Sequence, residues 1–441
     1  MNPAVAVRIL TTKSNSGNKN PRGEKTMKIG KIILLGSMFV LALAAWTSAL
    51  SAEEVVIGYS GPLSGPAAEY SQDSINGIDM AIREINAAGG ISVKGETFTF
   101  KLKRLDDRAG MDQAIINARK FVNQDKAPVV FNSLATTIGA LLKINEAKGG
   151  EFLLVGYSSV HTHHNQGNRL LINPTPDFRS FVKAASDVAW QKGYRNGTMV
   201  VTLGEYGDAW RKHFRTVWEK KGGKIIGDIP VNYYTETDFS AQLTSALATR
   251  PDFLLIGGPS ATTALAVEQV RSMGFKGGFV LTDQARMDYI ADILKNRKLM
   301  EGMIGIANVA DLPYPASAGF AAKYKETYKK AATWESALNY NTMHVLAKAM
   351  TIAGSARDPY AIRKAVGKAL PLLGDKYPSE LFSIEENGVM HSAGIVQNVE
   401  NGKFQKAYYT LDFPKTRAEF DKYKKVSRIR EPENYRWVPV E

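Results

Sequence analysis

Short apolar runs alternate with helix-like stretches along most of the chain. Phe152–Val155 and Phe253–Ile256 are typical runs, apolar throughout and followed by glycine. Between such runs, apolar side chains recur every three or four residues, as at Ile75, Ile78 and Ile82, which predicts amphipathic helices. Because the runs contain hardly any polar residue, we expect strands with both faces covered, as in a parallel sheet flanked by helices.

The predicted elements form two successive series of this kind. The first has strands near 55–59, 97–105, 128–131 and 152–155, separated by helices near 75–85, 112–122 and 138–147. The second has strands near 199–203, 224–231, 253–256 and 279–281, and helices near 178–190, 209–220, 239–248, 262–273 and 287–294. We expect Asp112 to cap its helix. These eight strands are more than one open sheet usually holds, so the pattern predicts an α/β fold with two doubly wound parallel-sheet lobes.

The pattern changes in the last third of the chain. Two prolines interrupt Asn173–Pro176, where we place the break between the lobes. From about residue 310 the predicted elements are helices near 316–330, 336–352 and 360–370 and short strands near 381–384, 394–397 and 405–409. Residues 412–441 mix basic and aromatic side chains without a clear period. We expect them to form a tail on the surface and assign them no function.

The first 52 residues are typical of a secretory signal peptide with a polar extension ahead of it. Two lysines precede the apolar run Ile32–Ala45, and small residues follow it. The run is shorter than the roughly 20 residues that span a bilayer, although an uncleaved anchor at Ile32–Leu50 stays open. We expect cleavage near Ala52, or else Ala49. The mature protein should be exported to the periplasm, and since it has no cysteine it should not be a lipoprotein.

Charge and cysteine content exclude several classes of protein. The formal net charge is +13, but seven basic residues and one acidic residue lie within residues 1–52, which leaves +7 for residues 53–441. Because that excess is spread along the chain and not concentrated on one face, we expect no nucleic-acid partner. The absence of cysteine rules out disulfides, thiolate metal sites and a cysteine nucleophile.

Motifs of common enzymes and cofactor sites are missing from the sequence. It holds no phosphate-binding P-loop, no zinc-protease or nucleophile-elbow motif and no calcium loop. His161, His163 and His164 could together hold zinc or copper, but neighbouring histidines point in divergent directions. We therefore expect no metal, no cofactor and no enzymatic activity, and leave a ligand contact by His161 open.

A ligand of such a fold would lie outside the carboxyl ends of the parallel strands. In the first lobe these ends carry hydroxyl groups, and in the second they carry acids and a tyrosine. The residues are Ser133, Thr136, Thr137, Ser158 and Ser159, and then Glu205, Tyr206, Asp208 and Asp283. An anionic group could bind on the first side and a cationic group on the second. Each of these residues could instead be a helix cap.

Several stretches resemble the periplasmic leucine/isoleucine/valine-binding protein family. They are VVIGYSGPLSGPAAEYSQDSINGIDMAIREINAAGGI (55–91), RLDDRAGMDQAIINARKFV (104–122), PDFLLIGG (251–258) and MGFKGGFVLTD (273–283). The resemblance implies two lobes joined by three crossovers, made of residues 53–173 plus about 311–385 and of 174–310 plus about 386–411. It further implies a monomeric solute-binding component of an ATP-driven (ABC) importer, with a membrane permease and an ATPase as partners.

The resemblance also implies a set of ligand contacts. Tyr70 matches the aromatic residue of the first loop, and Tyr206 matches the tyrosine of the second lobe. Ala135 with Thr136, and the segment Ser158–Val160 (Ser158, Ser159 and Val160), match the groups that hold the ligand carboxylate. Asp283 matches the acid that neutralises the ligand ammonium, and Gln284 follows it. Pro259 and Ser260 stand where amino-acid binders have a tyrosine, and we expect Ser260 in the site.

Three departures from the family pattern leave the identity of the ligand open. Hydroxyl groups are missing at Ala135 and Val160, and an aromatic residue is missing at Ser260 or its neighbour. Each lost charge-assisted hydrogen bond would weaken binding by about 1.5–3 kcal/mol unless a nearby hydroxyl replaces it. We expect an amino acid, branched-chain or similar. An aromatic or aliphatic carboxylate, an amide, or a role as a ligand-sensing receptor module stay as alternatives.

Overall fold

A computed structural model describes residues 52–65, 67–161, 164, 167–406, 408–431 and 435–437. The predicted signal peptide and its extension lie outside these residues, apart from Ala52. Within the described part, none of the helices combines the length and the apolar character that crossing a membrane requires.

The first sheet, sheet 1, has six strands in the order β2-β3-β1-β4-β5-β6. The strands are β1 (Glu53–Gly61), β2 (Ile91–Val93), β3 (Glu96–Asp106), β4 (Val129–Asn132), β5 (Leu153–Gly156) and β6 (Leu171–Ile172). All neighbours pair in parallel except β2, which runs antiparallel to β3. The helices of this part are α2 (Ala68–Ala87), α3 (Met111–Asp125) and α4 (Ala135–Leu141).

The second sheet, sheet 2, has the order β15-β14-β12-β11-β10-β9-β7-β8, with β13 paired to β12. Its strands are β7 (Asn196–Val201), β8 (Lys224–Asp228), β9 (Phe253–Gly257), β10 (Gly278–Leu281), β11 (Met303–Ile306), β12 (Gly394–Glu400), β13 (Lys403–Phe404), β14 (Tyr408–Leu411) and β15 (Tyr435–Trp437). The helices are α5 (Phe178–Gln191), α6 (Glu205–Lys220), α7 (Ser240–Ala248), α8 (Ser260–Ser272) and α9 (Met287–Leu294), with 3-10 turns at Arg297–Met300 and Val309–Asp311.

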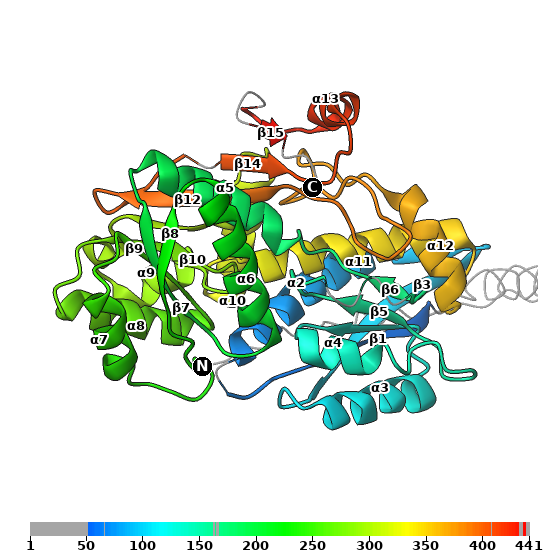
Figure 1. Cartoon of the computed structure of the whole chain (residues 1–441). Helices are drawn as coiled ribbons and strands as arrows, with labels where there is room; N and C mark the ends of the chain where they lie inside the picture. Colours follow the sequence, from blue (N-terminus) through cyan, green and yellow to red (C-terminus); the bar gives the residue numbers. More distant parts are fainter. Residues whose placement is uncertain are drawn as a thin grey trace, which may run out of the picture. The chain divides into compact units, whose positions relative to one another are not determined.

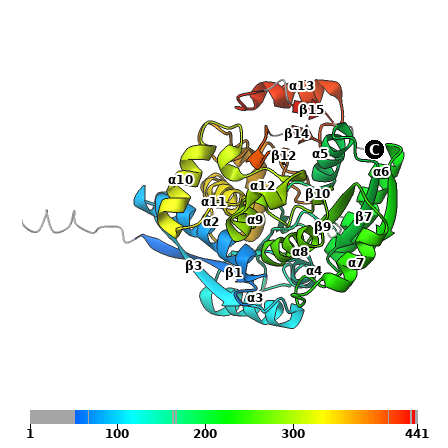
Figure 2. The ribbon, with the colours of Figure 1, turned by 90° about the vertical axis from the view of Figure 1, so that its left-hand side faces the viewer.

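Three later helices return to the side of sheet 1. They are α10 (Ser317–Tyr328), α11 (Trp334–Ala353) and α12 (Pro359–Ala369). Helix α11 packs lengthwise against α2 and also contacts α12, as Figures 1 and 2 show. The chain therefore passes between the sheets three times: after β6, after β11 and before β12. We call sheet 1 with α2–α4 and α10–α12 lobe 1, and sheet 2 with α5–α9 lobe 2; the residue boundaries of the lobes stay a prediction.

The central strands are buried on both faces, as their apolar runs predict. Every residue of β4, β5, β9, β10 and β11 is buried. In sheet 1, α3 and α4 lie on one side and α2 with α11 on the other (Figure 1). Cover by helices on both faces is the arrangement expected of parallel strands with continuous apolar runs.

The structure corrects four details of the sequence-based picture. Sheet 2 is mixed, because β12 runs antiparallel to both β11 and β14. Helix α3 begins at Met111 with Gly110 at its N-cap, so Asp112 lies in the first turn and is not the cap. Helix α4 runs from Ala135 to Leu141 and not over 138–147. The predicted strand at 381–384 forms only isolated bridges, at Leu381 and Ile384.

The C-terminal segment is more ordered than its composition suggests. It forms α13 (Arg417–Val426) and the edge strand β15, which pairs in parallel with β14. Figure 1 shows both in red beside sheet 2. Phe420 and Tyr435 are buried in the main core, so the described part of this segment packs onto the folded body.

Candidate ligand-binding site

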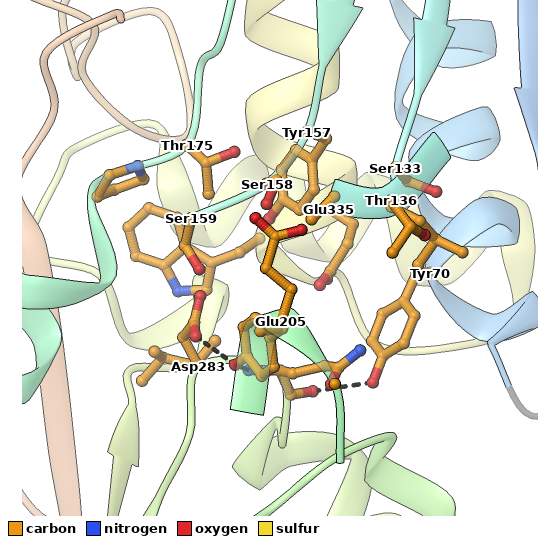
Figure 3. A pocket seen from close by; sticks show the side chains of 18 of the residues that line it. Tyr70, Ser133, Thr136, Tyr157, Ser158, Ser159, Thr175, Glu205, Asp283 and Glu335 are labelled. Atoms are coloured by element: carbon orange, nitrogen blue, oxygen red, sulfur yellow. Dashed lines mark hydrogen bonds between the residues drawn. The ribbon is translucent and has the colours of Figure 1, made fainter. Parts of the chain in front are cut away.

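A cavity of about 260 Å³ lies where the strand ends of the two lobes face each other. Figure 3 shows several of the side chains that line it. The lining residues are Tyr70, Ala109, Ser133, Leu134, Ala135, Thr136, Tyr157, Ser158, Ser159, Thr175, Pro176, Phe181, Leu203, Gly204, Glu205, Tyr206, Tyr234, Asp283, Gln284, Ile306, Trp334, Glu335 and Leu338. Both lobes contribute, so a molecule bound here would contact each of them.

The wall from lobe 1 is rich in hydroxyl groups. It is built by the turn after β4 and by the segment after β5, which the hydrogen bond from Tyr157 N to Asn132 O (2.8 Å) holds together. The side chain of Asn132 accepts from Leu134 N (3.2 Å) and from Thr137 Oγ1 (2.7 Å), which fixes the start of α4. Thr136, Ser158 and Ser159 then face the cavity, while Thr137 is buried inside α4 and does not line it.

The wall from lobe 2 centres on the carboxyl group of Asp283, which follows β10. Its Oδ1 accepts from Tyr206 Oη (2.5 Å) and from Trp210 Nε1 (2.9 Å). Both partners belong to α6, and Trp210 is fully buried. The hydroxyl of Tyr206 also accepts from Gln284 N (3.0 Å). The carboxyl group of Asp283 is thereby held in one orientation by two side chains of α6.

Burial governs the ionisation of the Asp283 carboxyl group. It raises the pKa of Asp283 above its ordinary value, although the hydrogen bonds from Ser159, Tyr206 and Trp210 act in the opposite direction. Burial likewise raises the pKa of Tyr206, with Asp283 adding to the effect, so this phenol remains a neutral donor at physiological pH. A cation placed against Asp283 would favour its charged form.

The ionisable side chains of acids and bases that line the cavity are all carboxyl groups. Its lining holds three carboxyl groups, of Glu205, Asp283 and Glu335, and among the lining residues there is no lysine, arginine or histidine. Glu335 lies on α11 and is ion-paired to Arg286 outside the cavity. A cationic group on a ligand is therefore favoured, and a carboxylate would depend on the hydroxyl and amide groups of lobe 1.

Eight of the ten predicted site residues line this one cavity: Tyr70, Ala135, Thr136, Ser158, Ser159, Tyr206, Asp283 and Gln284. Tyr70 also connects the lobes, since its hydroxyl donates to Gln284 O (3.2 Å). That these residues contact a ligand stays a prediction, but the structure brings them together around a common space.

The other two predicted residues lie outside the cavity wall. Val160 is buried in the core and is not among the residues that line the cavity. Ser260 is also buried, and its hydroxyl accepts from the backbone N (3.2 Å) and Nε (3.3 Å) of Arg286. Both therefore have structural roles in this conformation.

Sequence reasoning missed lining residues that come from distant elements. Trp334, Glu335 and Leu338 belong to the start of α11, and Phe181 to α5. None of them comes directly after the end of a strand, so the rule that located the other residues gives no signal here. Tyr157 could have been found, since it directly precedes the Ser158–Ser159 pair.

The histidine cluster supports no metal site in the described chain. The His161 ring contacts Asp177 (Nδ1 to Oδ2, 3.3 Å) and Thr175 O (Nε2, 3.2 Å). Burial lowers the pKa of His161, which Asp177 partly opposes. No group of three potential ligands is found among the described residues, and His163 lies outside them. His161 does not line the cavity.

Comparisons with known proteins agree with this fold. The family model for periplasmic binding proteins matches residues 54–403. A leucine-, isoleucine-, valine-, threonine- and alanine-binding protein from Pseudomonas aeruginosa is 23% identical over 346 residues, which is 77% of this chain and 89% of the relative.

Solved structures show the same fold. The branched-chain amino acid transporter substrate-binding protein LivJ from Streptococcus pneumoniae, in complex with isoleucine, has a TM-score of 0.69 and 22% identity, covering 81% of this chain and 99% of that one. A solute-binding protein of an ABC transporter from R. palustris, in complex with 4-hydroxybenzoate, has a TM-score of 0.67 and 18% identity, covering 81% and 97%. Because the family model covers most of the chain, the chain belongs to the periplasmic binding protein family.

Proposed function

We propose that the protein captures a zwitterionic amino acid in the periplasm and delivers it, as a monomer and without catalysis, to an ABC importer. The observation that carries this proposal is the pairing of one buried acid, Asp283 in lobe 2, with a hydroxyl wall in lobe 1. The ligand ammonium would bind Asp283 and Tyr206. The ligand carboxylate would bind Thr136, Ser158 and Ser159, whose hydroxyl groups can donate to it.

Capture would work through closure of the lobes. A ligand that contacts Ser159 on one side and Asp283 on the other makes both contacts only when the lobes are closed, so it stabilises the closed form by its differential affinity. The membrane permease would then recognise that form, and the ATPase would drive transport. Exchange between an open and a closed form is also what lets one ligand enter and leave.

A second candidate ligand is an aromatic carboxylate. Several aromatic side chains line the cavity, among them Tyr70, Tyr157, Phe181 and Trp334, and the similar R. palustris protein is described with 4-hydroxybenzoate. Against it, such a ligand would leave the carboxyl group of Asp283 buried without a cationic partner, and would bring a second negative charge to a cavity whose ionisable groups are acids.

Three matched ligands separate these candidates: L-leucine, L-leucinamide, which lacks the carboxylate, and 4-methylpentanoate, which lacks the ammonium. We expect L-leucine to raise the thermal unfolding temperature and to bind in calorimetry. Each of the other two should bind at least about tenfold more weakly, because each loses one charge-assisted contact. Binding of 4-hydroxybenzoate or 4-methylpentanoate at least as tightly as L-leucine would contradict the amino-acid proposal.

The affinity for an amino acid should depend on pH through Asp283. Since burial raises the pKa of this carboxyl group in the unliganded protein, and since a ligand ammonium binds its ionised form, the affinity should fall as the pH drops through that raised pKa and level off above it. Calorimetry with L-leucine between acidic and neutral pH measures the profile. The Asp283→Asn protein should give a flatter profile; an identical profile would assign the titration to another group.

A further inference from the structure

A buried arginine connects the two lobes beside the cavity. Arg286 lies between β10 and α9 of lobe 2, and its side chain is 1% exposed. Its guanidinium group reaches three carboxyl groups of lobe 1: Asp73 (Nη1 to Oδ2, 2.5 Å), Glu335 (Nη1 to Oε2, 3.0 Å) and Glu69 (Nη2 to Oε1, 3.2 Å). Each of these three ion pairs therefore crosses the boundary between the lobes.

Lobe 1 alone does not neutralise these acids. Lys330 is ion-paired to Asp73, and Tyr324 donates its hydroxyl to the same carboxyl group (3.1 Å). With Glu69 and Glu335 this leaves an excess of two negative charges on the lobe 1 side, and all three acids are buried. Buried like charges repel each other strongly because water is excluded, so this arrangement of the lobes depends on the cation from lobe 2.

Arg286 acts next to the ligand cavity without lining it. Its guanidinium carbon lies 5.2 Å from the ring centre of Tyr70, and it ion-pairs with Glu335; both of these residues line the cavity. Burial alone would lower the pKa of Arg286, but Glu335, Asp73 and Glu69 together hold it well above its ordinary value. The charge is therefore permanent, and its effect on a ligand would pass through the position of the lobes.

We propose that Arg286 is a positioning residue for lobe closure, an ionic latch that keeps the closed form populated even without ligand. The latch consists of Arg286 with Glu69, Asp73, Glu335 and Lys330. This proposal depends on the proposed function in one respect, namely that closing the lobes serves to capture the ligand. Opening the lobes separates the arginine from all three acids at once, whereas closing restores them, so the latch favours one defined closed geometry.

A distance measurement tests the latch directly. Because the chain has no cysteine, the exchanges Lys120→Cys on α3 and Glu268→Cys on α8 place one fluorophore on each lobe, both at exposed positions. In the ligand-free protein we expect a measurable closed population. Arg286→Met should lower the ratio of closed to open molecules at least about tenfold, which corresponds to about 1.4 kcal/mol, and should speed up dissociation of L-leucine.

Arg271→Met is the matched control. Arg271 is half-buried, and its guanidinium group donates to carbonyl oxygens within lobe 2, such as Leu299 O (3.0 Å) and Gly277 O (2.8 Å). Its loss should reduce thermal stability and leave the distance between the lobes unchanged. If the Arg286→Met protein does not fold, Arg286→Lys is measured instead. Lysine keeps the positive charge but lacks the planar guanidinium group that reaches several acids at once. The closed population of this variant should therefore be smaller than that of the wild type.

A double-mutant cycle with Glu69→Gln identifies the partner. The glutamine keeps an acceptor for Ser260 N, which now donates to Glu69 Oε1 (2.9 Å), and removes only the charge. The effects of Glu69→Gln and Arg286→Met on closure should be non-additive. A wild type that is entirely open without ligand, or an Arg286 variant with the wild-type distance distribution, would overturn the latch. Both results are read without ligand, so a failure of L-leucine to bind would count against the proposed function alone.

Discussion

The Asp283→Asn protein is expected to bind L-leucine roughly 10- to 150-fold more weakly than the wild type, the equivalent of one lost charge-assisted hydrogen bond of about 1.5–3 kcal/mol. Asparagine keeps an oxygen that can accept from Tyr206 and Trp210, whose donors now lie 2.5 and 2.9 Å from Asp283 Oδ1. The local packing is therefore retained and only the negative charge is removed. Isothermal titration calorimetry of both proteins gives the two dissociation constants.

The ligand without an ammonium group is the control for this exchange. The affinity for 4-methylpentanoate should stay the same or improve, because the exchange removes a negative charge from a cavity with no cationic side chain in its described lining. An equal loss of affinity for both ligands would mean that Asp283 acts through the shape of the site. An unchanged dissociation constant for L-leucine would take Asp283 out of the ammonium contact.

The fold could be predicted to the extent that it depends on local apolar patterns. β5 and β9 consist of apolar residues that are buried on both faces, so their sequences alone indicate covered parallel strands. The antiparallel pairing of β12 with β11 and β14 could not be predicted, because it depends on where the chain lies after three helices on lobe 1. The same holds for β15, whose three residues form a strand only because β14 offers an edge.

The site could be predicted where it follows strand ends. Ser158, Ser159 and Asp283 come directly after buried strands, and the rule for open α/β sheets places them at the crevice. Trp334 and Glu335 reach the same cavity from the start of α11, which no strand precedes. Arg286 had no signal at all: a lone arginine in a sequence does not show that three acids from α2 and α11 will surround it.

The Gly77→Ala protein is expected to be about 3 kcal/mol less stable than the wild type, a large value for a single added methyl group. Gly77 lies in α2 at its crossing with α11, and a Cβ atom there would stand 2.1 Å from the backbone oxygen of Ser336. A backbone atom in the first turn of a helix cannot rotate away, so the two helices must separate. Urea unfolding followed by circular dichroism measures the change.

The same exchange should also weaken ligand binding, because α2 carries Tyr70 while the first turns of α11 carry Trp334 and Glu335, and all three line the cavity. Gly319→Ala is the control: Gly319 lies in α10, is exposed, and a Cβ atom there meets nothing within 4 Å. Since alanine favours a helix over glycine, that protein should be up to about 1 kcal/mol more stable. Equal stabilities of the two variants would show that α2 and α11 can separate freely, and the cavity wall would then not depend on their close contact.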